Sequence, residues 1–220
     1  MSLLSEYLNE IKPGLEATSV EVEKEYSYFV HVTDEQLQTL LTRGEGLHIQ
    51  LFDELTFPFT KGAPKPRLRF YSKVGKLRSN EGLLAVKDPY EFTAKQKTDN
   101  GNNEHNTAVS QLQYESLEPL ASSKTSRMRI SVPVMQNDAP IVRANGSELA
   151  WEIDIYIDAQ RRTWSNWVKV ELEVDDFKYP NVAGAIPFDY ETLIESSSQE
   201  PSDREIIQNL YDHVYNLKSA

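Results

Sequence analysis

The sequence predicts an α+β fold in which eight mainly antiparallel strands close into a β-barrel with helices on its outside. Two observations favour this class. Segments with the period-two alternation of a β-strand recur along the chain, separated by turn residues and helix-like stretches. On six of these segments, residues of one charge stand at positions i and i+2, which places them on one face of the strand.

Length and composition indicate a single domain. The chain has 220 residues, of which 39% are hydrophobic and 26% charged, enough to bury one sizeable core. We assign the domain to the whole chain, with its core at residues 18–217 and a peripheral helix within residues 1–17. The chain contains no cysteine and shows neither a signal-peptide pattern nor an apolar run of membrane-spanning length, so a cytoplasmic location is expected. Its oligomeric state is left open.

The first strand is expected at residues 20–32, where the alternation is strong. One face of this strand is apolar, and the other carries Glu21, Glu23 and Glu25. A helix follows at once, because Thr33 and Gln36 have the spacing of a capping box. Gly44 is expected to end this helix.

Further strands and helices are expected along the rest of the chain. The strands are predicted at residues 46–55, 67–73, 91–98, 125–134, 149–158 and 167–175, with a weaker candidate at residues 82–87. Residues 58–66 are rich in proline and residues 99–106 in asparagine and glycine, so both are predicted to be loops. Helices are expected at residues 107–117 and, starting from a capping box of Ser202 and Glu205, up to residue 218.

The like-charged pairs indicate which face of each strand points inward. The acidic pairs are Glu21 and Glu23, Glu152 and Asp154, and Glu171 and Glu173; the basic pairs are Arg67 and Arg69, Lys95 and Lys97, and Arg127 and Arg129. A single pair is most simply a solvated face of an open sheet. However, the opposite faces carry large apolar residues such as Trp151 and Ile153, which need cover from helices outside the sheet. The charged faces are therefore predicted to line the interior of a closed barrel.

An interior with both signs of charge suits a metal-bound triphosphate. Arg and Lys side chains can bind phosphate oxygens, and carboxylates bind Mg²⁺ or Mn²⁺ ions that bridge the phosphates. The net charge of −11 repels nucleic-acid backbones, so we expect a small triphosphate-containing molecule as the partner. Neither a membrane nor a nucleic acid is expected, except for a 5′-triphosphate end of RNA.

Five of these segments resemble, in order and approximate spacing, the triphosphate tunnel metalloenzymes, also called the CYTH superfamily. The matching segments are Glu21-Val22-Glu23-Lys24-Glu25-Tyr26, Phe92-Thr93-Ala94-Lys95-Gln96-Lys97, Arg127-Met128-Arg129-Ile130, Trp151-Glu152-Ile153-Asp154-Ile155-Tyr156 and Val170-Glu171-Leu172-Glu173-Val174. The family includes inorganic and thiamine triphosphatases, class IV adenylate cyclases and fungal-type RNA triphosphatases. The resemblance implies an eight-stranded tunnel in which glutamates hold a divalent metal and basic residues bind the triphosphate.

The resemblance gives roles to the charged pairs, with hydrolysis of the terminal phosphate as the expected reaction. The metal ligands it implies are Glu21, Glu23, Glu171 and Glu173, with Glu152 and Asp154 as further or orienting ligands. The phosphate-binding set is Arg67, Arg69, Lys95, Lys97, Arg127 and Arg129. Among all of these, the catalytic residues are expected to be Glu21, Glu23, Lys97, Glu171 and Glu173.

Two departures from the family pattern leave alternatives open. Glu25 stands where the opening motif of the family has a lysine, and residues 159–166 replace a shorter turn that contains glycine. A tunnel that binds a nucleotide or polyphosphate without turning it over is therefore one alternative. A class IV adenylate cyclase is a second, and an open sheet whose charges are only solvated is a third.

Overall fold

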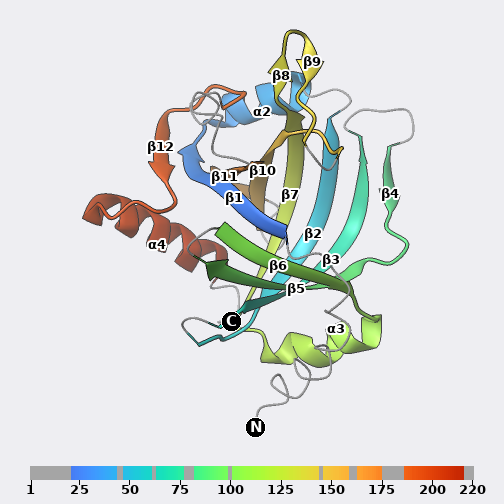
Figure 1. Ribbon diagram of the computed structural model, residues 1–220. Helices are drawn as coiled ribbons and strands as arrows, with labels where there is room; N and C mark the ends of the chain where they lie inside the picture. The colour runs from blue at the N-terminus through green and yellow to red at the C-terminus, as the bar shows by residue number, and fades with distance from the viewer. Residues whose placement is uncertain are drawn as a thin grey trace.

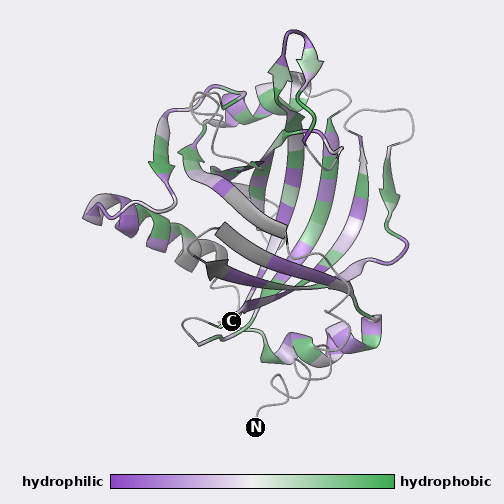
Figure 2. Ribbon diagram, in the orientation of Figure 1, coloured by the Kyte–Doolittle hydropathy of each residue, from purple (hydrophilic) through white to green (hydrophobic). Residues whose placement is uncertain are grey.

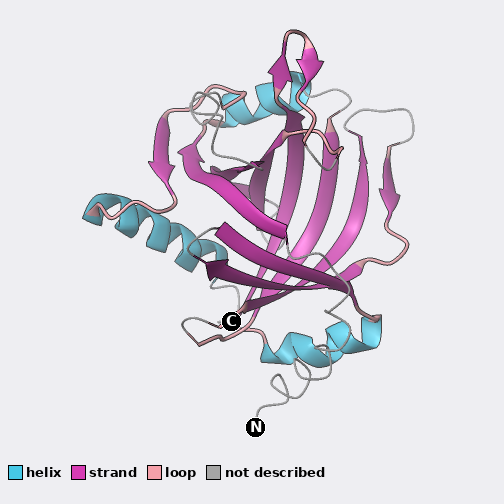
Figure 3. Ribbon diagram, in the orientation of Figure 1, coloured by secondary structure: helices cyan, strands magenta, loops and turns pink. Residues whose placement is uncertain are grey.

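The alternating segments form one mainly antiparallel sheet flanked by helices, as the computed structural model of the chain shows (Figures 1 and 3). The structure describes residues 21–43, 47–60, 63–76, 82–98, 101–143, 146–158, 163–174 and 186–215. For residues 21–24, 43, 97–98, 101–103, 158 and 211–215 it describes the backbone alone. The peripheral helix predicted within residues 1–17 lies outside the described residues.

The elements follow the predicted order with additions. The large sheet contains β1 (Glu21–His31), β2 (His48–Thr56), β3 (Lys65–Lys76), β4 (Leu83–Ala85), β5 (Tyr90–Thr98), β6 (Gly101–Ala108), β7 (Ser123–Pro133), β10 (Ala150–Asp158), β11 (Thr163–Val174) and β12 (Thr192–Glu195). A separate hairpin is formed by β8 (Met135–Gln136) and β9 (Ala139–Pro140). The helices are α2 (Asp34–Arg43), α3 (Gln111–Leu117), the 3₁₀ turn η1 (Glu118–Leu120) and α4 (Pro201–Tyr215).

The strand order returns to its own beginning. Neighbouring strands pair in the order β11-β10-β7-β2-β3-β5-β6-β1-β12, and β4 extends β3 on one side. In addition, β1 pairs with β11 from Lys24 opposite Val174 to His31 opposite Trp167. Figure 1 shows β1, β6 and β5 crossing in front of β7, β2 and β3. The α+β class and the antiparallel pairing are thus confirmed.

Apolar residues cover the outer faces of the strands, as the alternation predicted. Trp151, Ile153 and Val170 are at most 1% exposed and belong to a cluster that also contains Leu37 and Leu40 of α2. A second cluster joins strands β2, β3 and β5 to α3 at the other end of the sheet. Figure 2 shows the corresponding alternation of hydrophobic and hydrophilic bands along β7 and β2. The charged residues consequently occupy the opposite faces.

Residues 101–108 correct the prediction most. They form strand β6 rather than part of a loop, and the helix predicted at residues 107–117 begins only at Gln111, after a capping box of Ser110 and Gln113. Pairing with β5 on one side, and with β1 from Glu21 to Glu23 on the other, satisfies the backbone of β6 despite its weak strand propensity. The weaker strand candidate at residues 82–87 is present as the short strand β4, which pairs with β3.

The helix starts are partly as predicted. In α2 the capping box is confirmed, because the Gln36 amide donates to Thr33 Oγ1 at 3.1 Å and the Thr33 amide to Gln36 Oε1 at 2.8 Å. The capping box at Ser202 is wrong, since α4 already starts at Pro201. There the Ser198 hydroxyl accepts from the Glu200 amide instead.

Strand β11 already begins at Thr163, so the chain connection predicted at residues 159–166 is shorter than expected. None of the helices in the described part of the chain is long and apolar enough to cross a membrane.

The outer cluster should carry much of the stability of the fold. We expect Ile153→Ala to lower the free energy of unfolding by about 2–5 kcal/mol, because the side chain is fully buried and its loss leaves a cavity. Urea denaturation followed by circular dichroism measures this change. Leu112→Ala, at a side chain that is 72% exposed, is the control and should stay within about 0.5 kcal/mol of the parent. Equal effects of the two substitutions would contradict this assignment of the core.

Candidate functional site

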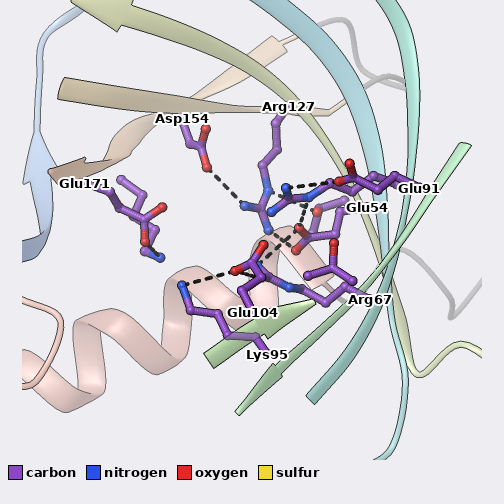
Figure 4. A network of polar contacts seen from close by, with 12 residues as sticks. Glu54, Arg67, Glu91, Lys95, Glu104, Arg127, Asp154 and Glu171 are labelled. Atoms are coloured by element: carbon purple, nitrogen blue, oxygen red, sulfur yellow. Dashed lines mark hydrogen bonds and ion pairs between the residues drawn. The ribbon is translucent and has the colours of Figure 1, made fainter. Parts of the chain in front are cut away.

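The candidate site is the set of charged side chains on the inner faces of the strands. Alternation along β3, β7, β10 and β11 brings the predicted arginines and acidic residues to one side of the sheet, opposite the apolar clusters. Figure 4 shows these side chains pointing toward one another from different strands. The predicted residues that the structure brings together here are Arg67, Arg69, Lys95, Arg127, Arg129, Glu152, Asp154 and Glu171.

Glu54 of β2 lies at the centre of the arginines. Its Oε1 accepts from Arg127 Nη2 at 2.7 Å, and its Oε2 accepts from Arg69 Nε at 2.9 Å, with Arg67 Nη1 3.6 Å away. The side chain is 3% exposed. Burial raises the pKa of Glu54, but the three arginines outweigh it and hold the pKa well below its usual value of 4.5. Sequence reasoning missed this residue because it has no like-charged neighbour at i±2.

Asp154 of β10, predicted as a metal ligand or orienting residue, forms ion pairs with two arginines. Its two carboxylate oxygens accept from Arg129 Nε at 2.6 Å and Arg129 Nη2 at 2.8 Å, a bidentate arrangement. Arg127 Nη1 donates to the same carboxylate at 3.1 Å. Burial raises the pKa of Asp154, but Arg129 and Arg127 lower it by more, so that the pKa lies below its usual value of 3.8.

Arg67 and Lys95 hold a second group of contacts, with β6. Arg67 Nη2 donates to Glu104 Oε2 at 3.3 Å, and Lys95 Nζ lies 3.7 Å from the same oxygen. Lys95 also donates to Glu25 Oε2 at 2.8 Å. The Nε of Arg67 is buried and has no hydrogen-bond partner among the described residues. Glu104 was missed because its strand was predicted to be a loop.

Acidic residues gather on the wall formed by β1, β10 and β11. In the strand register, Glu25 lies opposite Glu173, and Glu171 lies opposite both Ser27 and Glu152. Three cations contact this group: Lys95 pairs with Glu25, Lys169 contacts Glu171, and Arg129 Nη2 lies 3.5 Å from Glu171. Arg129 also contacts Glu152. A polyanion would thus meet cations and carboxylates within one interior.

Glu25 and Glu171 form a pair of carboxyl groups with opposite pKa shifts. Burial and the neighbouring Glu171 raise the pKa of Glu25, against the lowering effect of Lys169 and Lys95. Burial also raises the pKa of Glu171, but Lys169, a hydrogen bond from Glu25 and the charge of Arg129 hold it well below its usual value of 4.5. The two carboxyl groups therefore differ in their surroundings, with the cations acting mainly on Glu171.

Three predicted residues cannot be placed at the site by their side chains. Those of Glu21, Glu23 and Lys97 lie outside the described residues, although the backbone places Glu21 opposite Glu104. Glu173 is 3.8 Å from Arg143 Nη1 and is partly exposed. Among the side chains that the structure describes, no three His, Asp or Glu are grouped so that they could hold a metal ion.

An apolar cavity of about 380 Å³ lies on the other face of the sheet, beside α2. It is lined by Leu37, Leu41, Met128, Ile155, Ile157, Thr163 and Trp164. It contains no ionisable side chain, so it does not take part in binding a polyanion.

Comparison with known proteins gives likenesses in structure alone. No protein-family model matches the chain, and no curated protein matches its sequence. The inorganic triphosphatase NE1496 is similar in structure, with a TM-score of 0.42, 15% identity and coverage of 82% of this chain and 91% of that one. Protein PH1819 from Pyrococcus horikoshii matches with a TM-score of 0.47 at 10% identity, covering 84% of this chain and 99% of that one.

A proposed adenylate cyclase from Bacillus halodurans matches with a TM-score of 0.41 at 14% identity, covering 76% of this chain and 86% of its own. At such identities and TM-scores, the likenesses establish neither a shared activity nor the role of any residue.

The ion pairs of Asp154 should make the stability depend on pH. Because its folded pKa lies below 3.8, the charged carboxylate contributes stability above that pH and loses it as the pH falls through the folded pKa. We expect Asp154→Asn to lower the free energy of unfolding by about 3–5 kcal/mol at pH 7, since it removes the bidentate partner of Arg129 and one of the two carboxylates that Arg127 contacts.

The difference between Asp154→Asn and the parent should shrink as the pH is lowered below 3.8, where the parent carboxyl also becomes neutral. Urea denaturation between pH 7 and about pH 3 measures it. Asp138→Asn, at an exposed position of the hairpin, is the control and should show no such pattern. A difference that stays constant with pH would contradict the assignment of a charged Asp154.

Proposed function

We propose that the ring of eight strands encloses a tunnel that binds a metal-bound triphosphate and hydrolyses its terminal phosphate. The observation that carries this proposal is one interior that holds both a basic wall, in which Arg67, Arg69, Lys95 and Arg127 lie around Glu54 and Glu104, and the acidic wall of β1, β10 and β11 (Figure 4). The pairing of β1 with β11 supports the closure of the ring. The sequence motifs resemble the triphosphate tunnel metalloenzymes, and membership of that family is part of the proposal.

On the basic wall, we assign phosphate binding first to Arg67 and Lys95. Both lie beside Glu104, and Arg67 keeps a buried donor, Nε, that has no partner among the residues described. Arg69 and Arg127 lie deeper and hold Glu54. Positioning in line and stabilisation of the charge that develops on the phosphate supply most of the catalysis in such a reaction.

On the acidic wall, the residues suit Mg²⁺ or Mn²⁺ by the chemistry of their donors. Carboxylate oxygens are the ligands that these ions take up, and we propose Glu171 and Glu173 together with Glu21 and Glu23. Glu152, adjacent to Glu171 in the register, is a further ligand in this proposal. When bound, the cation neutralises charge on the phosphate oxygens. Asp154 is left out of this set, because both of its oxygens already bind Arg129.

Glu25 stands where the family has a lysine, and we assign it no step in the reaction. Its carboxyl group accepts a hydrogen bond from Lys95 Nζ at 2.8 Å. In the proposed reaction, a water molecule forms the new bond to the terminal phosphorus while the bond from that phosphorus to the oxygen of the leaving diphosphate breaks. The protons of the water end up on the phosphate products.

Lys95→Gln tests the basic wall. We expect it to lower phosphate release from tripolyphosphate by about 10²–10³-fold, because it removes a cation that contacts the ligand. Stability should change little, since the Lys95 side chain is partly exposed and Glu104 keeps its contact with Arg67. The assay uses Mg²⁺ or Mn²⁺ with tripolyphosphate, ATP and RNA bearing a 5′-triphosphate.

Lys124→Gln is the matched control, because Lys124 lies on β7 with its side chain 40% exposed and paired with Glu118 instead of the inner residues. Its activity should equal that of the parent. If the parent protein releases phosphate from none of these substrates, the hydrolysis is rejected. A triphosphate that still raises the melting temperature would then leave a non-enzymatic binder, the alternative that Glu25 favours.

A further inference from the structure

The surroundings of Glu54 resemble those of a bound phosphate group. Guanidinium groups of Arg69 and Arg127 donate to its two oxygens from neighbouring strands, and that of Arg67 lies 3.6 Å away. Arginines converging in this way on a planar or tetrahedral oxyanion are typical of phosphate recognition. Here the anion is a side chain of the protein itself.

The arginines around Glu54 still offer a buried hydrogen-bond donor that has no partner among the described residues. In this they differ from the arginine that binds Asp154. Asp154 takes a bidentate pair from Arg129 at 2.6 and 2.8 Å. By contrast, the nearest contact from Arg67 to Glu54 is longer than a hydrogen bond. The Nε of Arg67 is buried without a partner in the described part of the chain, a state that a further acceptor would relieve.

We propose that Glu54 is a built-in competitor for phosphate oxygens, which determines how many phosphates a ligand needs in order to occupy the arginine cluster. The inference rests on the proposed function, because it takes the ligand to be a polyphosphate. With no ligand bound, Glu54 keeps Arg67, Arg69 and Arg127 oriented and neutralises part of their charge.

The competition favours long anions over short ones. Glu54 is already attached to the site, so it loses no translational freedom on binding the arginines, whereas a free anion does. A single phosphate gains contacts at the cluster alone and competes poorly. A triphosphate can contact Arg67 and Lys95 as well. It can therefore bind when Glu54 gives up only part of its contacts with the arginines, or when the Glu54 side chain rotates away. The same competition helps orthophosphate to leave after hydrolysis.

Glu54→Gln tests this inference, because it keeps the shape of the side chain and removes its charge. Binding of orthophosphate, sulfate and tripolyphosphate is measured by calorimetry without metal and in EDTA, together with the melting temperature. We expect the variant to bind orthophosphate and sulfate at least about tenfold more tightly than the parent, which corresponds to about 1.4 kcal/mol. The gain for tripolyphosphate should be smaller.

Glu91→Gln is the control, because Glu91 lies 4.0 Å from Arg69, accepts from the Tyr71 hydroxyl and is 31% exposed. Its affinity for each anion should equal that of the parent. If Glu54→Gln binds orthophosphate no better than the parent does, the inference is overturned. Should Glu54→Gln fail to fold in buffer free of anions, the inference requires that orthophosphate restores folding, and failure to do so also overturns it.

The outcome is independent of the hydrolysis assay. A parent protein without phosphate release, combined with tighter anion binding by Glu54→Gln, rejects the reaction and supports the role of Glu54. A parent protein that releases phosphate, combined with unchanged anion binding by the variant, supports the reaction and rejects the role of Glu54.

Discussion

Arg127 links the charged residues in the interior of this protein. It lies on β7 and contacts one buried carboxylate on each of the two neighbouring strands. Asp154 on β10 and Glu54 on β2 both accept from its guanidinium group, which also lies 4.9 Å from the centre of the Tyr156 ring. Charges in such a place are costly unless each finds a partner. The apolar outer faces force the charged faces inward, and the ion pairs make that inward placement possible.

The same contacts orient the arginines before any ligand arrives. An enzyme that stabilises developing charge gains from donors that are already in place, because little reorganisation is needed during the reaction. In this interior, the groups that keep the fold intact and the groups that would bind phosphate are partly identical. Arg129 belongs mainly to the first kind, since Asp154, Glu152 and Glu171 surround it. Arg67 belongs mainly to the second.

The inner faces could be predicted from the sequence because their charges come in pairs at i and i+2. Paired residues such as Arg67 and Arg69 were placed correctly by this rule, whereas single ones were not. Glu54 has Phe52 and Thr56 at i±2, and Glu104 stands in a segment rich in asparagine and glycine. Such a segment becomes a strand only when neighbouring strands satisfy its backbone, which is a tertiary effect that local propensity does not contain.

The interaction partners of the charged side chains were harder to predict than the positions of these side chains in the sheet. Whether a carboxylate meets an arginine or another carboxylate depends on the register between strands that are far apart in the sequence. Asp154 lies opposite Arg129 and was expected to bind metal, whereas Glu25 lies opposite Glu173 and was noticed only as a departure from a motif. The sequence therefore located the site better than it distributed the roles within it.

Strand β6 pairs with β1 over a short stretch of the described chain. Its pairing with β1 extends from Glu21 opposite Glu104 to Glu23 opposite Asn102, whereas β1 and β11 are paired along most of their length. In the described part of the chain, this seam between β1 and β6 joins three residues of each strand. Lys95 and Glu104 lie directly beside the seam. A shift of β6 against β1 would therefore also move Glu104, the carboxylate that Arg67 and Lys95 share.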